Sequence, residues 1–493
     1  MPSGRSPSRA TGAAAAVATA AVAGVVIARR RLRRRRSTGP VGSTTQATRT
    51  GELAKLASQV GVGAAANRAR RVFASAPRKE ELDAELELRT AEQVAATLGN
   101  MKGALMKLGQ LASFLDTAMP DAARDALAQL QQDAPPMSGE LARGVVEADL
   151  GAPLARLFSE WDPVPIAAAS IGQVHRAITS DQRAVAVKVQ YPGIEEAIRA
   201  DLDNLDLASL GLPLLFSGLD VRAVGDELRA RLTEELDYQL EAANQRAFAD
   251  WYRGHPFIHV PEVVAELCGR RVLTTELADG VRFVDMERWE QSERDLAAEA
   301  IFRFVFRSLY RMRAFNGDPH PGNYLFAPGG QVTFLDFGLV KRFTPEDTAA
   351  LFAIVRSAVI EPDAAALRVA IERAGFIAPG APVPDERLAE FSEVFWGPIR
   401  NDEVTTITAD YASQVSRRYL TGRATDGDVI KWAGLPPAFV ILQRINFGLL
   451  AILGRLEATA NWRRVATELW PTDGPPSTPL GEEEAAWWRV THG

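Results

Sequence analysis

The spacing of apolar and polar positions divides the chain into regions of different texture. Residues 78–150 carry apolar side chains at three- and four-residue spacing, as in "EELDAELELRTAEQVAATLGNMKGALMKLGQLASFL", which predicts helices. A Pro-Pro pair interrupts this spacing, and Ser138 followed by Glu140 predicts that a new helix begins there. Residues 163–190 are richer in β-branched side chains and alternate, most clearly in "RAVAVKVQYPG", so this region predicts strands.

Further along the chain the two textures follow each other in a definite order. Residues 194–250 predict helices, and "VVAELCGRRVLTTELADG" returns to strands around a Gly-Arg turn. After Gly280 the chain is mostly helical, apart from "NGDPHPGNYLF" and the nearby "VTFLDFG". Between these, "YLFAPGGQVTFL" predicts a strand, a Pro-Gly-Gly turn and a second strand, a hairpin that would bring Asp336 close to Asn323.

Composition is typical of a globular protein. Apolar residues make up 47% and charged residues 24% of the 493 positions, enough for two or three domain-sized units. A single cysteine excludes internal disulfides, and five histidines leave little for a His-rich metal cage. Residues 438–453, "AFVILQRINFGLLAIL", are interrupted by Arg and Asn and are short for a membrane span, so we expect a buried helix.

The N-terminus differs from the rest in charge. Residues 1–50 carry ten Arg and no acidic residue. The uncharged, Ala-rich run 11–28 would span about 27 Å as a helix and leads directly into the Arg cluster 29–36, which favours either a marginal single membrane span with the following domains on the cytoplasmic side or a membrane-surface segment. A dispensable tail is the main alternative. No aromatic residue is interleaved with the arginines, so we expect no nucleic-acid partner.

Chemically useful side chains concentrate in "NGDPHPGNYLF", residues 316–326. Asp318 and Asn323 lie five residues apart, with His320 between them, so a metal site competes with a phosphoryl-transfer loop. In such a loop Asp318 would face the acceptor hydroxyl or water and Asn323 would hold Mg²⁺, with Asp336 as a second hard oxygen ligand. No other His or Cys lies in this block, so we expect His320 to be structural.

A lysine in a strand supports the second interpretation. Lys188 of "VAVKV" is one of seven lysines against 49 arginines, and a stiff strand would aim its ammonium at nucleotide phosphates. A strand lysine, an acidic helix, strands, a polar loop and Asp-Phe-Gly are the order of a two-lobed kinase. After Gly338 only "LVKRF" precedes the helix start at Thr344-Pro345, so the segment of roughly 20–30 residues that binds peptides in conventional kinases is missing.

Less common motifs resemble those of the UbiB/AarF (ADCK-type) atypical kinases over roughly residues 80–460. These are Lys107-x-Gly109-Gln110 in "MKLGQLAS", Ala167-Ala168-Ala169-Ser170 in "PIAAASIGQVHRA", Glu235-x-Asp237 in "EELDYQLEAAN", and the "GDPHPGN" and "DFG" segments. The alanine-rich segment is similar to the one that replaces the glycine-rich loop in this family, which implies an altered nucleotide preference. The resemblance also implies that the helices of residues 78–150 pack on the active-site cleft.

The acidic motif can be related to the lysines. Glu241 is the expected partner of Lys188, whereas Glu235 and Asp237, taken as part of the same helix, would face Lys107. We also assign Glu276 to nucleotide binding.

The predicted fold class is α+β, a two-lobed protein-kinase-like fold with an N-terminal helical extension and a mostly helical large lobe. The predicted segments are 1–43 (span and Arg cluster), 44–77 (linker), 78–150 (extension), 151–277 (small lobe with inserted helices), 278–470 (large lobe) and 471–493 (a loosely attached tail whose Trp487-Trp488 pair could dock on the fold).

The expected function is that of an atypical kinase or ATPase that binds ATP or ADP with Mg²⁺. Its expected partner is a membrane lipid or an isoprenoid- or quinone-type small molecule rather than a peptide, as the family resemblance implies. Two alternatives remain, a small-molecule kinase of the aminoglycoside-phosphotransferase type and a regulatory module that binds ATP without turnover.

Overall fold

The computed structural model describes residues 137–169, 171–196, 198–199, 233–234, 236–317, 319–421, 426–432, 434, 437–472 and 474–491. The predicted N-terminal span, the Lys107-x-Gly109-Gln110 motif, Ser170, Glu235 and Asp318 lie outside the described residues. The chain divides into two compact units. One comprises residues 106–191 and 226–493, and the other comprises residues 1–105 and 192–225, where Arg199 pairs with Glu195 at 2.7 Å.

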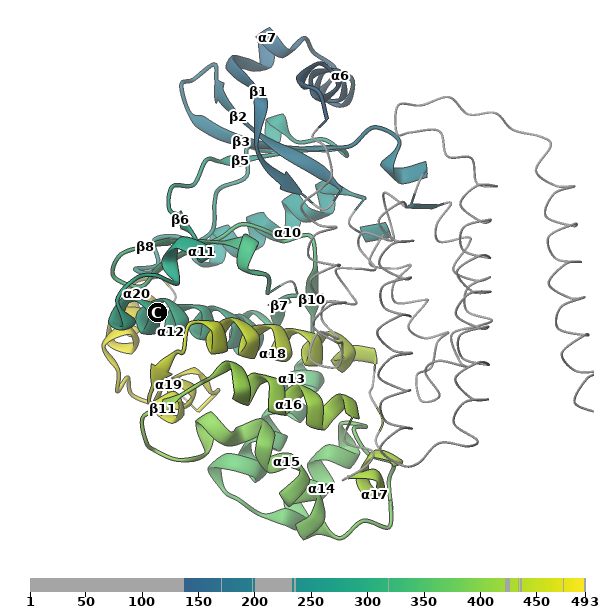
Figure 1. Cartoon of the computed structure of the whole chain (residues 1–493), viewed down its shortest axis with the longest axis vertical. Coiled ribbons are helices and arrows are strands. Elements are labelled where there is room, and N and C mark those ends of the chain that lie inside the picture. The colour runs from purple at the N-terminus through teal and green to yellow at the C-terminus, as the bar shows by residue number, and fades with distance from the viewer. Residues whose placement is uncertain are drawn as a thin grey trace, which may run out of the picture. The chain divides into compact units, whose positions relative to one another are not determined.

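Four antiparallel strands form the first sheet of the larger unit, in the order β1-β2-β3-β5 (Figure 1). They are β1 (Phe158–Ala169), β2 (Gly172–Thr179), β3 (Ala184–Gln190) and β5 (Val272–Glu276). The predicted strand region is confirmed, although it begins at Phe158, before the predicted start. Helix α10 (Tyr238–Trp251) and the short helix η3 (Ala265–Leu267) both contact β5.

Helix α6 (Gly139–Leu150) packs on this sheet. The Ser138 side chain accepts a hydrogen bond from Leu141 N and starts the helix as predicted, and Gly151 ends it with φ +68°. The buried face of α6 joins the valines of β3 in one apolar cluster, which includes Ala142, Val145, Val146, Val185 and Val187. Helix α6 therefore belongs to the core of the first sheet, and the boundary predicted after residue 150 does not separate two cores. The short helix α7 (Leu154–Leu157) follows.

A second sheet has the order β4-β9-β8-β6. Its strands are β4 (Ile258–His259), β6 (Val281–Arg282), β8 (Tyr324–Ala327) and β9 (Gln331–Phe334). Strands β8 and β9 form the predicted hairpin, and Gly329 and Gly330 adopt φ +77° and +74° in its turn, a conformation that favours glycine.

The rest of the larger unit is mainly helical. Its helices are α11 (Phe283–Met286), α12 (Gln291–Arg307), η4 (Ser308–Met312), η5 (Pro321–Asn323), α13 (Pro345–Val355), η6 (Arg356–Ile360), α14 (Ala364–Arg373), α15 (Asp385–Arg400), α16 (Ala409–Thr421), α17 (Gly427–Ile430), α18 (Pro437–Arg455), α19 (Trp462–Leu469) and α20 (Pro479–Thr491). Short strands pair β7 (Ala314–Asn316) with β10 (Val340–Arg342) and β11 (Thr405–Thr406) with β12 (Thr459–Ala460).

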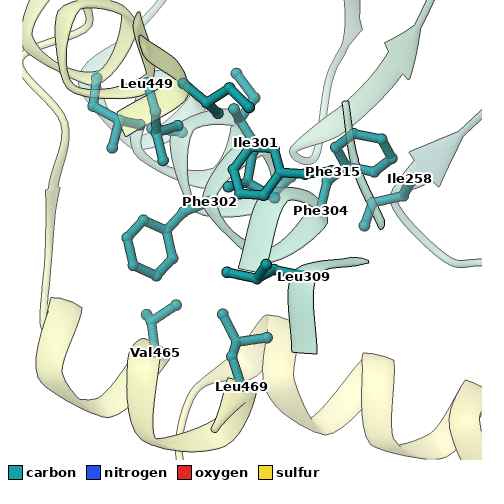
Figure 2. Packing of buried hydrophobic residues seen from close by; sticks show 14 of the residues in the cluster. Ile258, Ile301, Phe302, Phe304, Leu309, Phe315, Leu449, Val465 and Leu469 are labelled. Atoms are coloured by element: carbon teal, nitrogen blue, oxygen red, sulfur yellow. The ribbon is translucent and has the colours of Figure 1, made fainter. Parts of the chain in front are cut away.

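One large apolar core holds most of these helices together, and a smaller one contains Leu388 of α15 and Val429 of α17. Figure 2 shows side chains of α12 meeting those of α18 and α19, with Ile301, Phe302, Leu449 and Val465 among them. Each side chain of this size contributes roughly 1.5–3 kcal/mol when it is fully buried. Two sheets and a helical region with its own core confirm the predicted α+β architecture.

Two predictions about apolar or terminal segments can be checked here. Residues 438–453 lie within α18, whose Ile445 and Leu453 are buried in the large core, so the predicted buried helix is confirmed. In the described part of the chain no helix has the length and apolar character needed to cross a membrane. The prediction of a loosely attached C-terminal tail is wrong, because α20 buries Leu480 and Glu484, whereas the docking of Trp487 on the fold is confirmed by its burial in the large core.

Candidate functional site

Lys188 lies at the centre of a cluster of charged side chains. Its Nζ is 2.7 and 2.9 Å from the two carboxylate oxygens of Glu241 and 3.4 Å from Oδ2 of Asp336. The Lys188 side chain is 16% exposed and the Glu241 side chain 4%. The predicted pairing of the strand lysine with the helix glutamate is confirmed, and the structure adds Asp336 to the same cluster.

The cluster fixes the charge of Lys188. Burial by itself would lower the pKa of the Lys188 ammonium, but the carboxylates of Asp336 and Glu241 raise that pKa well above its usual range. The ring of Tyr238, whose centroid is 5.0 Å from Nζ, adds a cation–π contact. Lys188 therefore carries a positive charge at every physiological pH.

The start of α10 places Glu241 opposite Lys188. Asp237 caps this helix by accepting a hydrogen bond from Gln239 N (3.0 Å), and Glu241 follows in the first turn. Two bonds hold this end of the helix against the first sheet, from Tyr238 N to Arg270 O (3.0 Å) and from Gln190 Nε2 to Leu236 O (2.9 Å).

This arrangement corrects one expectation about the acidic motif. Asp237 was expected within the helix that carries Glu241, but it is the N-cap residue before that helix, and its backbone is extended (φ −111°, ψ 94°). Its carboxylate is used, at least in part, as a helix cap.

Asp336 is held by contacts that the sequence reasoning missed. Gly338 N donates to Asp336 Oδ1 (2.9 Å), and Asn316 Nδ2 donates to the Asp336 carbonyl (2.7 Å). Asn244 of α10 donates to the carbonyl of Phe337 (3.3 Å). The same helix that carries Glu241 thus also holds the Asp-Phe-Gly segment.

A ring contact supports the same link. Phe337 is fully buried, and its ring packs on Phe248 of α10 with centroids 4.9 Å apart. In the sequence, Asn244 ends "EAAN", three residues after Glu241, and Asn316 begins "NGDPHPGN". Their positions in these two motifs were the available signal for a role at the site.

The β8–β9 hairpin brings the backbone of Asn323 next to Leu335, the residue before Asp336. The hairpin pairs Tyr324 with Phe334, and Leu335 N donates to the Asn323 carbonyl (3.0 Å). His320 Nδ1 accepts a hydrogen bond from Gly322 N (3.0 Å), which shapes the turn before Asn323. This contact agrees with the structural role expected for His320. Among the described residues no group of three or more His, Cys, Asp and Glu side chains could hold a metal ion.

The alanine-rich segment ends a strand. We call residues 167–169 and 172–174 the alanine hairpin, in which Ala167, Ala168 and Ala169 pair with Val174, Gln173 and Gly172. Val174 of β2 also pairs with Lys188 of β3 on its other side. Since paired residues share a face of the sheet, Ala167 and Ala169 lie on the Lys188 face and Ala168 on the opposite face.

Gly172 permits close packing behind the alanine hairpin. A Cβ atom at this position would lie 2.2 Å from the carbonyl oxygen of Val189 and 3.0 Å from the hydroxyl of Tyr238. The tip of the alanine hairpin is thus in contact with β3 and with the first residue of α10.

Glu276 does not join the Lys188 cluster. It ends β5 and pairs with Val185, whose side chain faces α6, so its side chain starts from the other face of the sheet. Its carboxylate accepts from Glu262 N (3.3 Å) and lies 3.4 Å from His259 Nε2. A contact between this carboxylate and a ligand beside Lys188 is therefore not supported.

The segment after Asp-Phe-Gly is short, as predicted. Strand β10 pairs with β7, and α13 begins at Pro345 with a capping box between Thr344 and Asp347. The chain passes from Gly338 to this helix with no room for a long peptide-binding segment.

Comparisons with known proteins agree with this geometry. Residues 129–370 match the family model described as the ABC1 atypical kinase-like domain. The chain is 36% identical to the mitochondrial atypical kinase COQ8B of Rattus norvegicus, over 54% of this chain and 51% of that protein. It is 31% identical to the probable protein kinase UbiB of Marinobacter nauticus, over 54% of this chain and 50% of that protein. The chain thus spans about half the length of these curated relatives.

A solved structure covers more of the chain. The Rv3197–erythromycin complex from Mycobacterium tuberculosis is 35% identical, with a TM-score of 0.58, and the match covers 80% of this chain and 98% of that one. The alanine hairpin, the Lys188–Glu241 pair and the short segment after Asp-Phe-Gly occur in a chain that matches these proteins in both sequence and fold. This chain belongs to the ABC1 atypical kinase-like family, the UbiB/AarF group that its motifs predict.

Proposed function

We propose that this chain binds a magnesium–nucleotide complex and transfers or releases its terminal phosphoryl group, acting on a small molecule or lipid rather than on a peptide. The observation that carries the proposal is the Lys188–Glu241–Asp336 cluster. A lysine held by a helix glutamate and facing an aspartate after a β-hairpin is the arrangement that kinases use to hold nucleotide phosphates.

The side chains of Asp336 and Asn323 have the chemistry to bind Mg²⁺. Asp336 offers a carboxylate and Asn323 a carboxamide, which are the hard oxygen ligands that Mg²⁺ prefers, and phosphate oxygens and water would complete its coordination. When bound, the ion would neutralise charge on the phosphates. The chain's own residues hold this set in place, since Asn316 anchors the Asp336 backbone and the hairpin fixes Asn323.

Roles for the remaining residues follow from their chemistry. Lys188 would bind phosphate oxygens with a permanent positive charge, and Glu241 would keep the ammonium in position when the nucleotide leaves. Asp318 would orient the acceptor hydroxyl or water, as the loop motif predicts. Ala167 and Ala169 would place methyl groups on the Lys188 face, where a glycine-rich loop would leave space.

The substrate class rests on the short segment between Gly338 and Thr344. Without a long segment there, the large lobe lacks the usual platform for a peptide, which favours a small or membrane-embedded acceptor. An isoprenoid- or quinone-type lipid is the acceptor class that the UbiB/AarF resemblance implies.

A thermal-shift and phosphate-release experiment tests the proposal. Saturating Mg²⁺–ATP should stabilise the wild-type chain, by about 2.7 kcal/mol at a ligand concentration one hundred times Kd. Asp336→Asn should lose most of this stabilisation, whereas Glu346→Gln, at an exposed position of α13, should keep it. An equal shift in the Asp336→Asn variant would refute the assignment. Binding without phosphate release would favour the regulatory module over an enzyme.

A further inference from the structure

A buried glutamine on β2 makes contacts that the proposed chemistry does not use. The Gln173 side chain, in a residue 1% exposed, accepts a hydrogen bond from Met137 N (2.9 Å) and donates one to Met137 O (3.1 Å). Its Nε2 is also 2.8 Å from Nε2 of His175. One amide group thus engages both backbone groups of Met137 and a buried imidazole. We call Met137, Gln173 and His175 the glutamine clamp.

The hydrogen-bond roles in the glutamine clamp are fully determined. Met137 N can only donate and Met137 O can only accept, so the Gln173 oxygen and nitrogen cannot be exchanged. The second N–H of Gln173 then points to His175, whose Nε2 must accept. His175 Nδ1 therefore carries the proton and donates to the Asp162 carbonyl (2.8 Å). Each hydrogen-bonding atom of the Gln173 amide and the His175 ring has a partner.

This arrangement requires neutral His175. The residue is fully buried, and its ring stacks on Trp161 with centroids 4.7 Å apart. Burial lowers the pKa of His175, against a smaller opposing effect of the Asp162 carbonyl and carboxylate. Among the described residues, Asp162 is the charged group that acts on the ring. A proton on Nε2 would place two donors, His175 and Gln173, against each other.

The glutamine clamp connects two parts of the first sheet. Gln173 pairs with Ala168 in the alanine hairpin, and the next residue, Val174, pairs with Lys188. Met137 immediately precedes Ser138, the cap of α6, and belongs to the apolar cluster under the sheet. Gln173 and His175 share the α6 face, whereas Lys188 lies on the other. In Figure 1, α6 lies beside the strands of this sheet.

We infer that Gln173 is a positioning residue that fixes the alanine hairpin to the start of α6, with His175 setting the orientation of its amide. A shift of the chain at Met137 would therefore move β2, and with it the strand next to Lys188. The consequence for nucleotide affinity rests on the proposed function, whereas the inference that Gln173 fixes the alanine hairpin is independent of it.

Hydrogen exchange of the full-length chain tests the inference without nucleotide. Gln173→Met keeps the side-chain volume but removes all three contacts, so amides of residues 163–178 should exchange at least about fivefold faster than in the wild type. The matched control is Ser138→Ala, which weakens the cap of the same helix but leaves the glutamine clamp intact. It should leave exchange in the alanine hairpin within about twofold of the wild type. Equal exchange in the two variants would overturn the inference.

Nucleotide binding gives a second measurement. Gln173→Met should weaken Mg²⁺–ATP binding by about threefold to tenfold, and Ser138→Ala should weaken it by less than twofold. Unchanged affinity in Gln173→Met would remove the link from the alanine hairpin to the nucleotide. If the wild type binds no nucleotide, the proposed function fails, while hydrogen exchange still decides whether the glutamine clamp holds the alanine hairpin.

A pH profile separates this role from simple packing. In Gln173→Glu the new carboxylate can accept from Met137 N but has no proton for neutral His175, so it should favour charged His175 and raise its pKa. Hairpin exchange in this variant, relative to Ser138→Ala at the same pH, should therefore slow as the pH falls from 8 to 5. The corresponding ratio of hairpin exchange rates, wild type over Ser138→Ala, should stay constant or rise over the same pH range. Identical profiles for Gln173→Glu and the wild type would overturn the role given to His175.

Discussion

Helix α20 offers a direct test of how buried charge holds the large lobe together. Glu484 of this helix is 1% exposed and accepts hydrogen bonds from Arg303 Nη1 (2.9 Å), Arg307 Nε (2.9 Å) and Arg307 Nη2 (2.8 Å). Arg303 is itself fully buried and also pairs with Glu299 (2.8 Å) and Glu468. We predict that Glu484→Ala lowers the free energy of unfolding by about 3–5 kcal/mol.

The magnitude follows from what the substitution leaves behind. Three charge-assisted hydrogen bonds at roughly 1.5–3 kcal/mol each set an upper limit. The loss is smaller because Arg303 keeps two carboxylates and Arg307, 11% exposed, keeps the Glu468 carbonyl (3.3 Å). It remains large because a buried guanidinium loses a partner in a site that water cannot easily enter.

The same contacts set a pH dependence. Burial alone would raise the pKa of Glu484, but His255, whose Nε2 is 3.8 Å from Glu484 Oε1, and the hydrogen bonds and positive charges of Arg307 and Arg303 hold that pKa well below its usual value of 4.5. A carboxylate with a lowered pKa stabilises the folded state at pH above its unfolded pKa, and this contribution is lost as the pH falls through its folded pKa. The stability difference between wild type and Glu484→Gln should therefore narrow as the pH falls below about 4.5.

Urea unfolding at pH 7, followed by fluorescence, measures the effect of Glu484→Ala. Glu482→Ala is the matched control because Glu482 is an exposed residue of the same helix, and it should change stability by less than about 0.5 kcal/mol. A loss below about 1 kcal/mol for Glu484→Ala would show that α20 is not anchored by this carboxylate.

Two further predictions concern the first sheet and α10. Asp237→Ala should lower the free energy of unfolding by about 1 kcal/mol because it removes the helix cap, whereas Asp237→Asn should keep the cap. Unchanged nucleotide turnover in Asp237→Asn would argue against a functional pairing of the Asp237 charge with Lys107. Gly172→Ala should destabilise the chain by roughly 1–3 kcal/mol because the new Cβ would lie 2.2 Å from the Val189 carbonyl oxygen. The control Gly144→Ala, whose Cβ would have no atom within 4 Å, should stabilise the chain. If urea unfolding shows no loss of stability in Gly172→Ala, the close contact is contradicted.

The sequence was most informative where one local pattern had one structural solution. Ser138 and Thr344 start helices because their hydroxyls satisfy backbone N–H groups within the same turn. The Pro-Gly-Gly turn returns the chain, so the Asn323 carbonyl accepts a hydrogen bond from Leu335, the residue before Asp336. Lys188 and Glu241 pair because a lysine on a stiff strand and an acid in the first turn of a helix are the expected partners in this fold.

Local patterns failed where distant contacts decide the outcome. The C-terminal "EEEAAWWRVTHG" predicts a loosely attached tail. Contacts with Arg303, Arg307 and His255, all far away in the sequence, make Glu484 a core residue. Asp237 was taken as part of a continuous helix, since spacing alone cannot show where the backbone becomes extended and the helix begins.

The sequence by itself determined the order of the elements, the α+β class and the side chains that we propose for binding phosphate and Mg²⁺, because periodicity, turn residues and acid–base chemistry are properties of short segments. The tertiary structure decided which of these side chains meet. It placed Asp336 with Lys188, turned the Glu276 side chain away from them, and joined Gln173 to Met137 across 36 positions of sequence. The physical reason is that hydrogen bonds and ion pairs depend on ångström distances, and only packing of the whole chain sets the distance between residues that are remote in sequence.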